Sequence, residues 1–178
     1  MQTIRIVLAL LHIYTCLAVG VVDAVVRLVC GVMPDEMLLD DFVADNRLTR
    51  FKSMTYISSV LFSRFSCSTT ELYPSPVMIT LAHRKAGPDG FACFTESLAH
   101  FLGLREISRN YVYFTDGTRC VVCVMLCNDG YYYCIGTTIV STLSSHDAIN
   151  VGRIVAHKLD KQLDFVLRFE YHRLTESC

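Results

Sequence analysis

Cys93 is the residue whose sequence context best fits a nucleophile. It follows a glycine-containing loop and opens a segment with helical spacing. The partial positive charge of a helix N-terminus stabilises a thiolate and lowers the thiol pKa. Catalysis would also need a histidine as base and an acid or amide to orient it. His146 with Asp147 would supply these groups, and His157 with Asp160 is the second available pair.

The segment from residue 89 to 100 resembles the nucleophile segment of papain-like cysteine peptidases. The resemblance implies a hydrolase in which Cys93 attacks the substrate. That family also uses an upstream glutamine in its oxyanion hole, and no glutamine lies between Gln2 and Gln162. The competing interpretation makes Cys93 a half-buried core thiol or a disulfide partner.

Four further cysteines, Cys120, Cys123, Cys127 and Cys134, lie close together in the sequence. The first two have the C-x2-C spacing of many zinc sites, which need four ligands converging on one point. Residues three apart on a strand face opposite sides, so these two thiols should diverge. We therefore predict no metal and no cofactor.

Cys123 and Cys134 are the candidates for a disulfide. If residues 128 and 129 form the hairpin turn, Cys123 lies opposite Cys134. If residues 129 and 130 form it, Cys127 faces Tyr132 and the pairing is lost. The sequence leaves both registers open.

A run of three tyrosines, Tyr131, Tyr132 and Tyr133, precedes Cys134. Tyrosine is favoured at protein interfaces, so the run could form an exposed recognition patch. The alternative is an ordinary strand with one buried and two half-buried tyrosines.

The N-terminal residues 1–24 have the parts of a secretory signal peptide. Arg5 precedes an apolar stretch that ends near Val22, and small residues allow cleavage after Gly20 or Ala24. Two alternatives remain open, because the stretch approaches the length of a membrane anchor and could also belong to one long hydrophobic helix ending near Gly31.

The cysteine count agrees with a secretory protein. Removing residues 1–24 removes one of the nine cysteines, and the even number that remains fits a set of disulfides. The alternative is a cytoplasmic protein that uses free cysteines as small hydrophobic residues.

The elements that would position these residues form a single α+β domain over residues 25–178. Asp-Gly and Asn-Asp-Gly turns predict a three-stranded antiparallel meander over about residues 110–143. The remaining segments predict helices at 35–46, 91–104 and 144–163, a strand or short helix at 53–66, and strands at 77–83 and 164–172. We expect the helices to pack on one face of the sheet.

Composition excludes two classes of protein. With 52% hydrophobic residues and a net charge of -1, the chain is neither disordered nor a strongly basic nucleic-acid binder. The order helix, three strands, helix over residues 91–163 nevertheless resembles double-stranded RNA-binding domains. Ser145 and His146 stand where that family carries lysines.

The sequence therefore favours a non-enzymatic, cysteine-rich protein that binds another protein and is secreted or held in the endoplasmic reticulum lumen. Membrane contact is expected only through residues 1–24 if they are not cleaved, and nucleic acid is not an expected partner. The first alternative is a cytoplasmic cysteine hydrolase that uses Cys93. The second is a degenerate RNA-binding-like module used for interaction.

Overall fold

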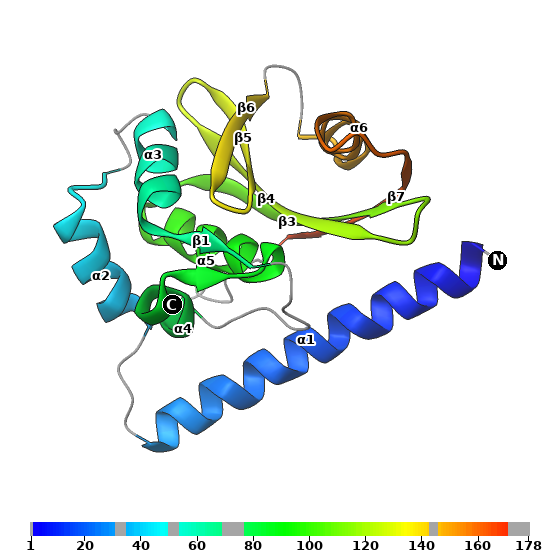
Figure 1. The fold of residues 1–178 in the computed structure, drawn as a ribbon. Helices are drawn as coiled ribbons and strands as arrows, with labels where there is room; N and C mark the ends of the chain where they lie inside the picture. The colour runs from blue at the N-terminus through cyan, green and yellow to red at the C-terminus, as the bar shows by residue number, and fades with distance from the viewer. Residues whose placement is uncertain (1, 31–34, 50–53, 69–76, 143–145, 171–178) are drawn as a thin grey trace.

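A five-stranded antiparallel sheet organises the chain, with strand order β6-β5-β4-β3-β7 (Figure 1). The computed structural model describes residues 2–30, 35–49, 54–68, 77–142 and 146–170. The strands of this sheet are β3 (Arg105–Phe114), β4 (Arg119–Cys127), β5 (Gly130–Ile135), β6 (Thr138–Thr142) and β7 (Leu163–Glu170). The last strand in the sequence pairs with β3, so the sheet joins distant parts of the chain.

The helices around the sheet confirm the α+β class. They are α1 (Gln2–Cys30), α2 (Asp35–Asp45), α3 (Met54–Arg64), α4 (Val77–His83), α5 (Pro88–Phe101) and α6 (Ala148–Lys158). A small parallel pair, β1 (Ser66–Cys67) and β2 (Lys85–Ala86), links the segments that follow α3 and α4.

The predicted meander is present but has one strand more than expected. The turn between β3 and β4 forms as predicted, with the Thr118 N–H donating to Asp116 Oδ1 at 2.9 Å. The segment expected as one strand at 131–143 is instead a hairpin of β5 and β6. Gly136 makes this turn with φ of +55°, a backbone conformation that glycine adopts readily. Apolar and β-branched residues on both sides conceal the turn in the sequence.

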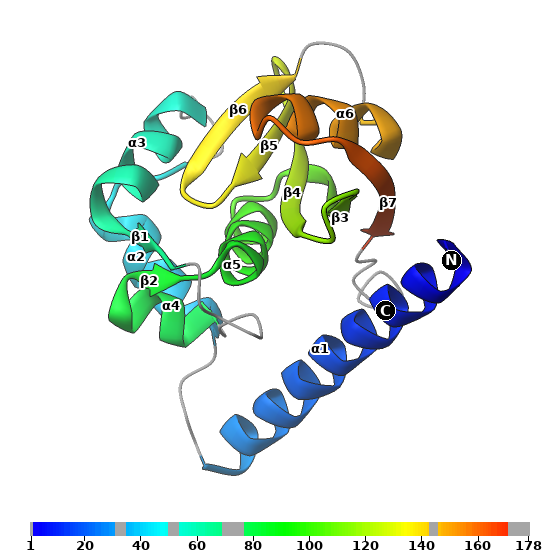
Figure 2. The ribbon, with the colours of Figure 1, turned by 45° about the vertical axis from the view of Figure 1, so that its right-hand side comes forward.

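The helices cover both faces of the sheet, so the expectation of one covered face is wrong. Alternate residues of β4 point to opposite sides. Cys123 shares a core cluster with Phe94 of α5. Val122 and Val124 pack with Val151 of α6. Figure 2 shows α5 and α6 separated by the sheet.

The predicted strand at 77–83 is also wrong, because these residues form α4. Its β-branched residues favour a strand locally. Val77 and Thr80, which are three residues apart, are both buried, and this is the spacing of one helix face. Packing against the neighbouring helices α2 and α5 therefore overrides the local preference.

Several predicted boundaries shift by a few residues. Helix α5 begins at Pro88 rather than Phe91, and proline is well suited to a first helical turn. Gly103, with φ of +70°, follows its end as expected. Helix α6 ends at Lys158, before the predicted Leu163, which instead begins β7.

Candidate functional site

The register of the β4–β5 hairpin is the one that places Cys123 opposite Cys134. Both thiols are free and buried. Thr95 Oγ1 lies 3.3 Å from Cys134 Sγ, which in turn lies 3.0 Å from the carbonyl oxygen of Gly136. The geometry therefore pairs the two residues, and the disulfide itself stays a prediction.

The cysteines of β4 and β5 have the electrostatic character of core residues. Burial raises the pKa of both Cys120 and Cys134 to about 12, and it raises the pKa of Cys127 to about 11. Burial also raises the pKa of Cys123 well above its ordinary value. A thiol in this state is neither a good nucleophile nor a ready metal ligand at neutral pH. Across the described part of the chain, no three His, Cys, Asp or Glu side chains are placed to hold a metal ion.

Cys93 lies half-buried on α5, on the side of the sheet where Arg109 projects from β3. Arg109 forms an ion pair with Glu96, one helical turn after Cys93. Burial acts to lower the pKa of Arg109, but Cys93, Glu96 and Tyr111 more than reverse this effect, and the pKa rises well above its ordinary value. The cation beside Cys93 is therefore permanent, and its charge is already balanced by Glu96. Sequence reasoning missed Arg109, because nothing local in β3 marks it.

The structure does not bring His146 and Asp147 to Cys93. Asp147 caps α6, with Oδ2 accepting from the Asn150 N–H at 3.2 Å. The carbonyl oxygen of His146 accepts from Arg168 Nη1 at 2.8 Å. Arg168 alternates with Leu167 and so lies on the α6 side of the sheet. The sheet separates this side from Cys93, so the geometry does not assemble the predicted catalytic set.

The resemblance to RNA-binding domains also weakens in the structure. Four strands, not three, lie between α5 and α6, and the two helices pack on opposite faces.

His146 instead lines a cavity of about 450 Å³ at one end of the sheet. Its lining comprises His100, Leu104, Glu106, Ile107, His146, Arg168 and Glu170. Both of its carboxylates are engaged, since Glu106 accepts from the Tyr131 hydroxyl at 2.6 Å and Glu170 pairs with Arg168 at 2.6 Å. No local sequence pattern predicts this cavity, because its residues come from three distant segments.

The three tyrosines of β5 do not form one exposed patch. Tyr131 and Tyr133 face the α6 side, and Tyr132 faces the opposite side. Tyr133 is buried, while Tyr131 stacks on His146 with ring centroids 4.9 Å apart. The Tyr132 hydroxyl donates to Asp129 at 2.6 Å, which raises the pKa of Tyr132 to about 12. The three tyrosines therefore belong to an ordinary strand, with one of them buried and two half-buried, and not to an exposed recognition patch.

A different aromatic surface lies on the α5 side of β3 and β7. Tyr111 and Phe169 make an edge-on contact at 5.7 Å, and Tyr113 stacks on Phe165 at 4.5 Å. Helix α1 lies over this surface and buries Ile13 in it. We call the surface the α1 seat; it comprises Ala92, Tyr111, Tyr113, Val121, Leu167 and Phe169, with Asp164 at one end.

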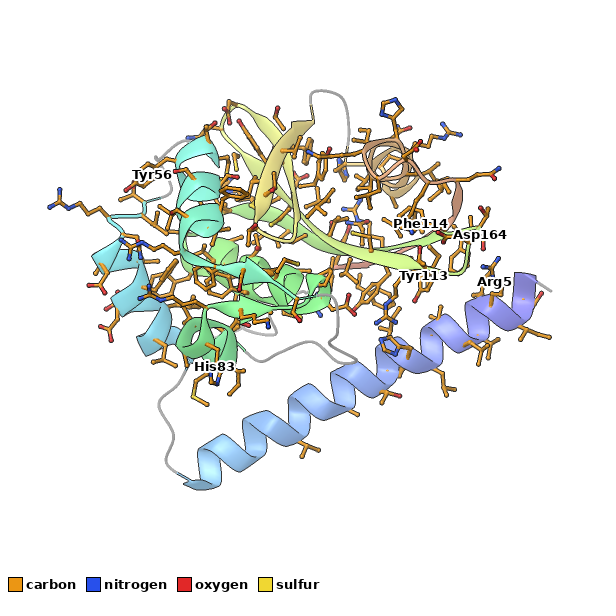
Figure 3. All side chains as sticks on the ribbon, in the orientation of Figure 1. Arg5, Tyr56, His83, Tyr113, Phe114 and Asp164 are labelled. Atoms are coloured by element: carbon orange, nitrogen blue, oxygen red, sulfur yellow. The ribbon has the colours of Figure 1, made fainter. Side chains whose placement is uncertain are left out.

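An ion pair fixes the N-terminal end of α1 to this seat. Arg5 Nη1 lies 2.6 Å from Asp164 Oδ2, and Arg5 Nη2 donates to the carbonyl oxygen of Phe114 at 3.4 Å. Figure 3 shows Arg5 reaching from α1 toward Asp164 and Phe114. One turn and two turns further along α1, Ala9 and Ile13 are buried. Among the described residues of α1, these three share one stripe that faces the domain.

The outward face of α1 is also apolar. Among the side chains of α1 that the structure describes, the large exposed apolar ones are between 52% and 65% accessible, and they are Ile4, Val7, Leu8, Leu11, Tyr14 and Val22. A continuous exposed apolar surface of this kind is unusual on a folded domain. It is typical of a site that contacts another protein or a membrane. Among the residues that the structure describes, no helix has the length and apolar character needed to cross a bilayer.

Comparisons of this chain with protein-family models, with curated proteins and with solved structures find no match.

Proposed function

We propose that this chain is a non-enzymatic protein of the secretory pathway that acts by binding another protein through the α1 seat. The observation that carries the proposal is the aromatic face of β3 and β7, which a predicted signal peptide covers. Cleavage after Gly20 or Ala24 would release α1 and expose this face. Tyrosine and phenylalanine are the residue types that dominate the centres of protein interfaces.

Both sides of α1 are apolar, and this supports a helix that first covers the seat and is then removed by cleavage. Ala9 and Ile13 face the seat, while Leu8 and Leu11 face outward. Docking removes only one side of this helix from water and leaves its outer apolar side chains exposed. This surface is what a signal peptide needs for recognition before it is cleaved.

The first test is the intact mass of the full chain expressed in a eukaryotic secretory cell line, alkylated with and without prior reduction. We expect the loss of the first 20 or 24 residues, and Cys123 and Cys134 alkylated only after reduction and unfolding. A retained N-terminus, with both thiols alkylated on unfolding without reductant, would contradict the secretory part of the proposal.

The second test measures binding by the secreted product. Labelled protein should bind saturably to cells, with displacement by unlabelled protein. Leu167→Asp, in the seat, should abolish this binding, whereas the control Ile149→Asp, on the exposed side of α6, should leave it intact. Tyr113→Ser serves as a second seat variant, and thermal unfolding shows which variants are folded. Equal binding by folded seat variants and by the control would refute the role of the seat.

A further inference from the structure

The contact between α1 and its seat has a pattern that another helix could reproduce. Arg5, Ala9 and Ile13 are spaced by four residues and so lie on one stripe of the helix. The first residue supplies a cation, the second is small, and the third fills an apolar hollow. Arg5 meets Asp164 and Ile13 lies in the apolar cluster, while Ala9 is buried between them along the helix.

The apolar part of the pattern is set by close packing. Ile13 is 1% exposed and lies in one cluster with Ala92 of α5, Tyr111 of β3 and Val121 of β4. Ala9 is 4% exposed, and a larger side chain there would push the helix away from the sheet. The seat therefore selects a small residue followed, one turn later, by a branched aliphatic residue.

The charged part of the pattern is set by Asp164. Its side chain is only 15% exposed, and its carboxylate meets Arg5 at 2.6 Å. When α1 leaves, this carboxylate loses the cation that faces it across the seat. A half-buried carboxylate next to an apolar face favours a ligand that brings its own positive charge.

We propose that the α1 seat receives an amphipathic helix of a partner protein with a basic residue, a small residue and a branched aliphatic residue at four-residue intervals. This inference rests on the proposed function, and it names the class of ligand. Helix α1 acts as a placeholder in the same site, and its covalent attachment gives it a high effective concentration there. A partner helix therefore binds well only after α1 has left the seat.

The experiment uses the full chain and a fluorescent peptide copy of residues 2–15, with Leu8 and Leu11 replaced by glutamine for solubility. In the chain, the double variant Arg5→Glu/Ile13→Asp releases α1 from the seat. Fluorescence anisotropy should show the peptide binding this variant at least tenfold more tightly than the wild-type chain. The matched control is Leu8→Asp, an outward position on α1 that is 62% exposed, and it should bind no better than wild type. Equal binding by the released variant and the control would overturn the inference.

A charge swap tests the basic residue of the pattern. An Arg5→Glu peptide should bind the released chain roughly fivefold more weakly, because a half-exposed ion pair is lost. Adding Asp164→Lys to a chain released by Arg5→Gln/Ile13→Asp, whose α1 has no carboxylate at position 5 to pair with the new lysine, should restore binding of the Arg5→Glu peptide and weaken binding of the original peptide. Two peptides that bind every chain equally would overturn the assignment of Asp164. Neither result touches the cell-binding test with Leu167→Asp, so a wrong helix pattern and a wrong function give different outcomes.

Discussion

Cys123 on β4 and Cys134 on β5 are direct partners in the antiparallel ladder, with both thiols free and almost fully buried. A bridge between them needs no change of register. It does need a thiolate, and burial suppresses that form in the folded protein. A disulfide at this position therefore has to form during folding, before α5 closes over the hairpin.

The buried thiols give the reduced protein a stability that falls at alkaline pH. Burial raises the pKa of Cys134 from an ordinary 9.0 to about 12, so between these values the unfolded chain loses a proton that the folded protein keeps. The stabilising effect is complete below pH 9 and is lost as the pH rises toward 12, at about 1.4 kcal/mol per pH unit for each such thiol. Urea unfolding at pH 9.5 and 10.5 measures the slope. Cys134→Ala should reduce it, and an unchanged slope would show that Cys134 ionises freely in the folded protein.

The ion pair between Glu96 and Arg109 predicts an asymmetry between single and double variants. Their side chains are 7% and 15% exposed. Arg109→Met leaves the Glu96 charge buried without its cation, and should lower the free energy of unfolding by about 3–5 kcal/mol. Glu96→Leu/Arg109→Met removes both charges and should cost clearly less. Urea denaturation compares the variants, and a double variant less stable than Arg109→Met would contradict this account.

Gly152 of α6 packs directly against two side chains of β7. A Cβ atom there would overlap Cγ2 of Val166 and come within 3.1 Å of Leu163 Cδ1. Valine has little freedom to move aside, so Gly152→Ala should cost about 1–3 kcal/mol despite the better helix propensity of alanine. The neighbouring exposed position supplies the control, since Arg153→Ala should be nearly neutral. Thermal unfolding of the two variants tests this, and equal midpoints would show that the helix shifts to make room.

Docking of α1 should weaken at acid pH. Burial, and then the charge of Arg119, lower the pKa of His12, and Asp89 only partly offsets them. The docked helix therefore favours neutral His12, and its docking weakens as the pH falls below the ordinary value of 6.5. Hydrogen exchange of α1 between pH 7.5 and 5.5, corrected for the intrinsic rate, measures the change. His12→Gln should remove the pH dependence, whereas a dependence that persists would assign it to another group.

Local signals in the sequence predict the structure where a tight turn decides it, since the 115–118 turn forms as predicted and Gly103 follows the end of α5. The start of α6 is less well predicted, because the helix was expected from residue 144, whereas Asp147 is its N-cap and Ala148 begins it. The strand predicted at 77–83 failed because burial of Val77 and Thr80 by other helices decides that segment. Contacts between distant segments could not be predicted either, because no local residue pattern encodes them. Arg5 and Asp164 come from opposite ends of the chain, and neither carries a sequence pattern that would pair them.

The long stretch of sequence between α1 and β7 determines which part of the α1 contact is synthesised first. The α1 seat contains Tyr111 of β3 but also Leu167 and Phe169 of β7, so the seat is complete only after residue 169 has been synthesised. At ordinary translation rates, the intervening residues take about 10–30 s to emerge. During that interval α1 has been synthesised but cannot dock, because its seat is still incomplete. Any protein that binds α1 during synthesis therefore meets the helix before the seat is complete.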